Sequence, residues 1–184
     1  MHRQSLDGDA VFLIHDLLAP AECEALVARS EALGYEFATV GGESLPGYRN
    51  NARATLTDPA LAADLWARAA PHVPATFGGW HATGLCDRFR VYRYETAESF
   101  GLHQDGVVTR GDKESRLTFL VYLSAVEQGG ETRFYQPGRR LEFTVQPHPG
   151  TALVFEHPRL HEGAPVLRGR KYVLRTDVLY RPPA

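Results

Sequence analysis

Cysteine is scarce in this sequence, and its charges nearly cancel. The two cysteines, Cys23 and Cys86, are too few for the disulfide framework of a small secreted domain, so we expect a reducing, cytoplasmic setting. Twenty Lys and Arg residues stand against 22 Asp and Glu residues, for a formal net charge of −2. Without a basic surplus the chain has no electrostatic preference for nucleic acid or an anionic membrane, and we expect neither as a partner.

Long apolar runs, internal repeats and low-complexity segments are also missing. The N-terminal run VFLI is short and ends at His15 and Asp16, which does not suit a signal peptide or a membrane span. The 184 residues are 43% hydrophobic and 23% charged, as in an ordinary globular protein. We therefore expect one domain over residues 1–184.

The first part of the chain, residues 1–84, predicts helices and loops that support the rest. One helix is expected between Pro20 and Gly34, because proline suits a first turn and glycine a helix end. A second is expected after Asp58, an N-cap residue that is followed by Pro59. The polar segment between the helices predicts a long loop or an irregular strand pair.

After residue 85 the pattern changes to that of β-strands. Turn signals such as Gly129-Gly130 and Pro149-Gly150 separate several short stretches rich in β-branched and aromatic residues: DRFRVYRY, RLTFLVYL, ETRFYQ, LEFTVQP, TALVFE and KYVLRTDVLY. Two helices followed by seven or eight strands indicate a mainly β (α+β) fold. We expect a β-sandwich or barrel with the N-terminal helices packed on one face.

Two polar residues in the stretch SFGLHQDGVV are candidate metal ligands. His103 and Asp105 are two positions apart, and on a strand such residues project from the same face. His157 or His161, which follow a buried strand, offers a third ligand. Two histidines and one carboxylate form the facial triad of non-haem Fe(II) oxygenases, which leaves coordination positions open.

Lys171 adds a second clue to the same chemistry. A turn at Arg168-Gly169 predicts a hairpin that returns Lys171 beside the strand bearing His161. Fe²⁺ with one carboxylate and two neutral imidazoles has a net charge of +1. A chelating dianionic 2-oxo acid brings this to −1, and one buried lysine restores neutrality.

Hydroxyl groups on neighbouring predicted strands are available to help hold that 2-oxo acid. These belong to Tyr94, Tyr122 and Thr132.

Four stretches resemble, in order, the motifs of the prolyl-4-hydroxylase-like 2-oxoglutarate/Fe(II) dioxygenases: YRYETAESFGLHQDG, RLTFLVYL, VEQGGETRFY and VQPHPGTALVFEHPRLHEGAPVLRGRKYVLRTDVLY. The resemblance covers residues 85–181 and implies a double-stranded β-helix (jelly-roll) catalytic core. It implies Fe(II) binding by His103, Asp105 and His161, with His157 as a neighbour of the site.

The resemblance also implies how the co-substrate is held. Lys171 is expected to pair with the distal carboxylate of 2-oxoglutarate and Tyr94 to hydrogen-bond it, while Tyr122 and Thr132 line the same pocket. Family chemistry then implies hydroxylation of an aliphatic C–H bond with O₂. It is coupled to decarboxylation of 2-oxoglutarate to succinate and CO₂, with ascorbate as an optional reductant. No catalytic residue beyond the metal ligands is expected.

The substrate is the least constrained part of the prediction. Asn51 and Arg53, in a polar segment that is a candidate lid, and Arg116 are candidates to bind a carboxylate or a peptide carbonyl. Their alternative role is that of ordinary surface or loop residues. A prolyl residue in a protein, a free amino acid and a small metabolite remain open as substrates, as does the oligomeric state.

Three alternatives share some of these features. The net charge and a lysine at position 171 argue against a nucleic-acid dealkylating oxygenase. A cupin-like hydrolase or isomerase would use the same metal ligands but has no need of Lys171 and Tyr94 behind the metal. A catalytically silent barrel that binds a metal or ligand is the third alternative.

Overall fold

The structure, a computed structural model that describes residues 1–37 and 48–183, has a large and a small β-sheet, a separate pair of short strands and two α-helices. The helices are α1 (Pro20–Leu33) and α2 (Pro59–Ala69), followed by the short 3₁₀ helix η1 (Ala70–His72). The Asp58 side chain accepts a hydrogen bond from the Leu61 amide at 2.9 Å, as expected of an N-cap residue. Neither α-helix of the described residues is long and apolar enough to cross a bilayer.

The large sheet has eleven strands. Its main path runs in the order β1 (His2–Asp7), β2 (Val11–His15), β14 (Ala152–Glu156), β10 (Lys113–Tyr122), β17 (Lys171–Arg181), β7 (Arg88–Tyr94), β4 (Ala52–Thr57) and β3 (Glu36–Phe37). Three short strands attach to this path: β5 (Thr76–Phe77), β6 (Trp80–Leu85) and β9 (Thr109–Arg110).

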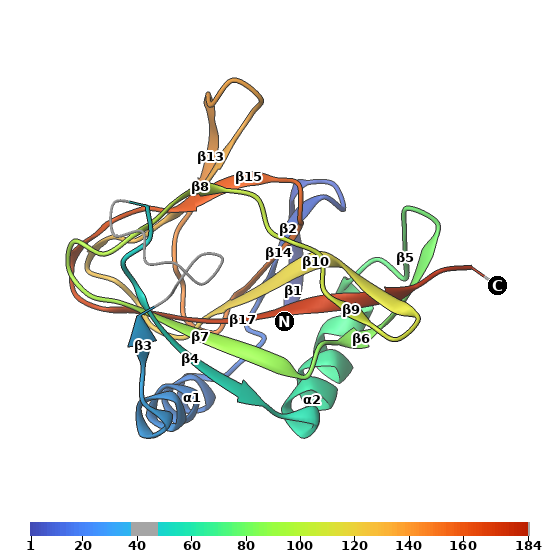
Figure 1. The fold of residues 1–184 in the computed structure, drawn as a ribbon, viewed down its shortest axis with the longest axis horizontal. Helices are drawn as coiled ribbons and strands as arrows, with labels where there is room; N and C mark the ends of the chain where they lie inside the picture. Colours follow the sequence, from blue (N-terminus) through green and yellow to red (C-terminus); the bar gives the residue numbers. More distant parts are fainter. Residues whose placement is uncertain (38–47, 184) are drawn as a thin grey trace.

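The small sheet has four strands, in the order β13 (Leu141–Val145), β12 (Thr132–Tyr135), β15 (Leu160–Gly163) and β8 (Phe100–His103). A separate pair is formed by β11 (Gln128–Gly129) and β16 (Val166–Arg168). Figure 1 shows the small sheet on one side of the large sheet and the two helices on the other. The expected double-stranded β-helix consists of this small sheet together with four strands of the large sheet, β14, β10, β17 and β7.

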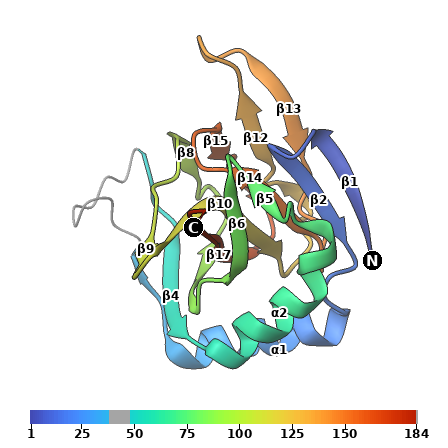
Figure 2. The same cartoon turned by 90° about the vertical axis from the view of Figure 1, so that its right-hand side faces the viewer.

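The helices pack on the outer face of the large sheet, and Figure 2 shows them side by side along it. Alternation along β10 explains the two layers of core. Phe119 and Val121 belong to the cluster shared with the helices, whereas Leu120 and Tyr122 belong to the cluster between the sheets. The expected mainly β fold with helices on one face is therefore correct.

Residues 1–84 contain more strand than the sequence predicts. The strand β2 pairs with β14, and β4 pairs with β7, so this region completes the large sheet as well as supplying helices. The expectation of helices and loops, with an irregular strand pair as the alternative between the helices, is therefore wrong for β2 and does not foresee that β4 joins the large sheet. Residues 11–14 are an apolar run buried on both faces, and such a run carries no alternation that separates strand from helix.

Candidate metal centre

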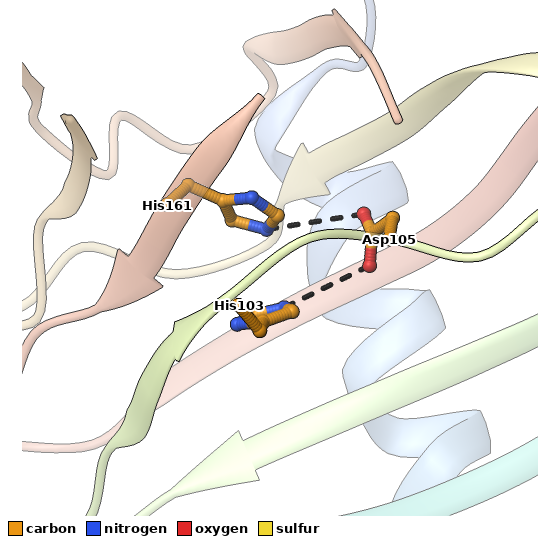
Figure 3. Close-up of side chains that lie close together, drawn as sticks. All are labelled: His103, Asp105 and His161. Atoms are coloured by element: carbon orange, nitrogen blue, oxygen red, sulfur yellow. Dashed lines mark ion pairs between the residues drawn. The ribbon is translucent and has the colours of Figure 1, made fainter. Parts of the chain in front are cut away.

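Three side chains converge between the two sheets: His103, Asp105 and His161. Each offers one ligand atom, and these atoms lie within 4.8 Å of one another. The Nε2 atom of His103 is 3.7 Å from Asp105 Oδ1, and that of His161 is 3.8 Å from Oδ2. Figure 3 shows both imidazoles pointing toward the carboxylate.

Strand pairing explains why the two histidines meet. His103 on β8 and His161 on β15 are direct antiparallel partners. Asp105 lies beyond the end of β8, so the strand geometry expected for both residues holds only for His103. Its carboxylate still faces His103, and its backbone amide donates to the carbonyl oxygen of His157 at 3.0 Å.

Backbone contacts fix the tautomer of both imidazoles. Nδ1 of His103 is 2.8 Å from the carbonyl oxygen of Gly101, and Nδ1 of His161 is 2.8 Å from that of Arg159. A carbonyl oxygen only accepts, so Nδ1 carries the proton in each ring. Burial lowers the pKa of His103 to about 3 and also lowers the pKa of His161, which keeps both rings neutral. Each Nε2 therefore presents a lone pair to Asp105.

Asp105 is held as an anion by donors from the large sheet. The Thr118 hydroxyl donates to Oδ2 at 2.6 Å, and a guanidinium nitrogen of Arg175 lies 3.1 Å from Oδ1. Burial alone raises the pKa of Asp105, but Arg175 and the other polar neighbours outweigh it and hold this pKa well below its usual value. Arg175 is in turn 3.3 Å from Asp177.

This donor set suits a divalent transition metal. Two neutral imidazoles and one carboxylate bring three lone-pair donors together without a proton between them, an arrangement that a cation stabilises. The set matches the facial triad of non-haem Fe(II) sites, which leaves other coordination positions open. The residues present therefore fit Fe(II).

A cavity adjoins the cluster, and Lys171 is one of the residues that line it. The lining residues are Tyr92, Tyr94, Phe100, His103, Asp105, Leu120, Thr132, His161, Gly163, Lys171, Val173 and Arg175. Lys171 is 2% exposed, and its Nζ donates to the neutral carbonyl oxygen of Gly130 at 2.6 Å. Burial lowers the pKa of Lys171 to about 8. A buried ammonium whose contact is a neutral acceptor suits a carboxylate ligand.

Lys171 reaches this cavity by a different route from the one the sequence predicts. It begins β17, which pairs with β10 and β7 in the large sheet, whereas β15 with His161 pairs with β12 and β8. The predicted hairpin beside the strand of His161 is wrong. The chain crosses between the sheets through β16, so Lys171 and His161 lie in different sheets.

Two of the three predicted hydroxyl residues line the cavity. Tyr94 pairs with Lys171 across β7 and β17, and the ammonium lies 4.9 Å from the centre of its ring. Thr132 also lines the cavity, and its hydroxyl is 2.8 Å from that of Tyr122. Tyr122 itself is fully buried and does not line the cavity, so this part of the prediction is wrong.

The three substrate candidates lie apart from one another. Arg116 lines an open cleft of about 310 Å³ that also reaches Asp105, and its guanidinium lies 3.9 Å from the ring centre of Trp80. Asn51 is fully buried and accepts from Arg49 at 2.9 Å. Arg53 lines another pocket, beside Glu36. The structure therefore brings only Arg116 near the metal ligands.

The candidate lid, residues 49–53, lies within the described residues. Residues 38–47 of the long polar segment lie outside the described residues. Arg49 forms an isolated antiparallel β-bridge with Phe100. Ala52 and Arg53 already belong to β4 and pair with β7, so this end of the predicted lid is a strand of the large sheet and not a loop.

Sequence reasoning missed Thr118 and Arg175. Arg175 is four residues after Lys171 on the same strand, so the period of two places both on one face. Thr118 is a polar residue within the buried run LTFLVY of β10. Both signals are present in the sequence and would have identified the two residues as neighbours of the site.

Comparison with known proteins agrees with this geometry. The family model of the 2OG-Fe(II) oxygenase superfamily matches residues 89–176. Probable prolyl 4-hydroxylase 3 of Arabidopsis thaliana is 27% identical over 201 residues, covering 88% of this chain and 66% of that protein. Prolyl 4-hydroxylase 13 of the same plant is 30% identical over 111 residues, covering 47% of this chain and 40% of that protein. The chain thus spans less than two thirds of these relatives.

Solved structures share the fold. A prolyl hydroxylase from Trichoplax adhaerens, in complex with a hypoxia inducible factor peptide fragment, gives a TM-score of 0.71 at 17% identity, covering 94% of this chain and 84% of that one. A Pseudomonas putida prolyl-4-hydroxylase gives a TM-score of 0.68 at 19% identity, covering 95% of this chain and 93% of that one. The family model, the fold and the metal-ligand cluster agree, and the chain is similar to the prolyl-4-hydroxylase-like 2OG-Fe(II) oxygenases.

Proposed function

We propose that this chain hydroxylates an aliphatic C–H bond with O₂ while 2-oxoglutarate is converted to succinate and CO₂. His103, Asp105 and His161 would hold Fe(II), and Lys171 would hold the distal carboxylate of 2-oxoglutarate. The main support is one arrangement: three lone-pair donors without a proton between them line the same cavity as a buried ammonium. Such a cavity suits a dianion that chelates a metal at one end.

When bound, Fe(II) and 2-oxoglutarate supply the oxidising chemistry, and the protein supplies position and shelter. Lys171 anchors one end of the co-substrate, and the apolar walls Leu120 and Val173 keep water away from the other. Tyr94 and Thr132 offer hydroxyls along the same cavity. No acid–base pair of the chain is needed, because its groups bind and orient while the cofactor carries the oxidation.

A peptide or protein is the proposed substrate class, with a prolyl residue as the reacting group. The open cleft that reaches Asp105 approaches the metal ligands and is lined by Arg116 and the apolar Phe77, Val107 and Pro158. An apolar wall with one guanidinium suits a ring such as proline and an adjacent peptide carbonyl. The Trichoplax adhaerens enzyme, which shares the fold, was solved with a peptide bound.

We also propose a cytoplasmic setting. Cys23 and Cys86 are both free and buried, a state that a reducing compartment maintains.

An anaerobic titration of the apo-protein with Fe(II) and then 2-oxoglutarate tests the proposal. We expect the visible charge-transfer band of the chelate to appear in the wild type, to weaken in Lys171→Ala and to be lost in Asp105→Ala. In air, with a prolyl peptide, succinate should form together with hydroxyproline. Full iron loading without the band would reject the oxygenase assignment in favour of a hydrolase or a binding barrel. The band without peptide hydroxylation would reject only the substrate class.

A further inference from the structure

A chain of buried hydrogen bonds ends on the candidate metal ligand Asp105. Thr118 donates to Asp105 Oδ2 at 2.6 Å, and its hydroxyl lies 3.0 Å from His157 Nδ1. His157 Nε2 lies 2.8 Å from the Ser115 hydroxyl, which accepts from the Val108 amide at 2.8 Å. His157 and Thr118 are 3% and 0% exposed, so water does not substitute for these contacts.

The direction of each bond follows from the groups at the two ends. The Thr118 hydroxyl has one hydrogen, and the carboxylate of Asp105 can only accept it. His157 Nδ1 must therefore donate to Thr118, which leaves Nε2 as the acceptor from Ser115. Burial lowers the pKa of His157, in agreement with a neutral ring that has one donor and one acceptor. Each bond points toward Asp105, and reversing one would leave a buried group unpaired.

We propose that His157 is a positioning residue, which holds the Thr118 hydroxyl toward Asp105 and so fixes this carboxylate for the metal. The inference rests on the proposed metal site, and it gives a role to a histidine that is not itself within the ligand cluster. With Thr118 on Oδ2 and Arg175 on Oδ1, each carboxylate oxygen has one strong donor and cannot turn freely. Partners of this kind are worth about 10- to 100-fold in metal affinity.

The experiment measures Co(II) binding to the apo-protein by its visible d–d absorption, which reports both the dissociation constant and the coordination. Thr118→Val should raise the dissociation constant about 10- to 100-fold and alter the spectrum, whereas Thr118→Ser should stay within about threefold of the wild type. His157→Phe should also raise the dissociation constant for Co(II). The double variant His157→Phe/Thr118→Val should match Thr118→Val alone, because His157 acts through that hydroxyl.

Thr176→Val is the matched control. Thr176 is a fully buried threonine of the large sheet, and its hydroxyl donates to the backbone carbonyl oxygen of Cys86 at 2.6 Å and not to a residue of the cluster. We expect this variant to lower the thermal midpoint and leave Co(II) affinity unchanged.

Each other result is decisive. An unchanged affinity in Thr118→Val, an equal loss in Thr176→Val, or independent effects that multiply in the double variant would overturn the inference. A wild type that fails to bind one Co(II) would instead overturn the proposed function beneath it.

Discussion

At the residue scale, the two cations of the cavity differ in what satisfies their charge. Arg175 has carboxylates within the protein, at 3.1 Å in Asp105 and 3.3 Å in Asp177. Lys171 contacts the neutral carbonyl of Gly130 instead. The charge of Arg175 is therefore balanced in the fold itself, whereas that of Lys171 is available to an anionic ligand.

This difference predicts how co-substrate binding depends on pH. Burial lowers the pKa of Lys171 to about 8, so the amine loses its proton as the pH rises through that value. A dianion binds the charged form, and its affinity should be flat below about pH 8 and fall by about tenfold for each pH unit above it. Calorimetric titration of the Mn(II)-loaded protein with 2-oxoglutarate, from about pH 7 to about pH 9, measures this slope.

Lys171→Arg serves as the control, because a guanidinium stays charged over this range. The affinity of this variant for 2-oxoglutarate should be lower than that of the wild type but independent of pH. The same slope in both proteins would show that some other group titrates.

At the element scale, the turn before β14 is fixed by a close backbone approach. The Gly150 carbonyl accepts from the amides of Leu17 and Leu18 at 2.9 and 3.2 Å, and its own amide donates to Tyr122 at 2.8 Å. Its φ is +79°, and a Cβ there would overlap the carbonyl oxygen of Leu18. The turn therefore ties the segment after β2 to the central strands.

Gly150→Ala should destabilise the protein through both strain and overlap. Gly138 has a similar φ of +86° with nothing within 4 Å of a built Cβ, so Gly138→Ala isolates the backbone strain. We expect the control to lower the free energy of unfolding by about 1 kcal/mol, and Gly150→Ala to cost about 2 kcal/mol more. Urea denaturation followed by circular dichroism compares the two. Equal losses would contradict the role of the Leu18 contact.

The helices and most of the strands are predictable from the sequence, but the pairing of the strands within the sheets is not. The runs RLTFLVYL and KYVLRTDVLY are β10 and β17, and the expected helices are α1 and α2, because periodicity and caps are local signals. That β17 lies between β10 and β7 depends on contacts distant in sequence. For the same reason the sequence predicts Lys171 as an anchor but places it beside the wrong strand, in the wrong sheet. The buried strand β2 lacks the alternation that would reveal it.

At the scale of the whole molecule, ligand binding should be linked to stability. A metal that binds only the folded chain stabilises it by about 2.7 kcal/mol at a concentration of 100 times its dissociation constant. For a chain of this size, that energy corresponds to a rise in the thermal midpoint of roughly 5 to 10 °C.

Differential scanning calorimetry with and without Mn(II) measures this rise, and chelation with EDTA should reverse it. Asp105→Ala should melt at the same temperature with or without the metal. A similar rise in that variant would place the metal elsewhere.

The position of the cluster between the two sheets has a consequence for how long a loaded molecule survives. His103 and His161 belong to the small sheet, while Thr118 and Arg175 hold Asp105 from the large one. A cation in this place would act as a reversible cross-link in a chain whose two cysteines are free. Separation of the layers and release of the ion would then be a single event, so the loaded form would owe its lifetime to slow unfolding.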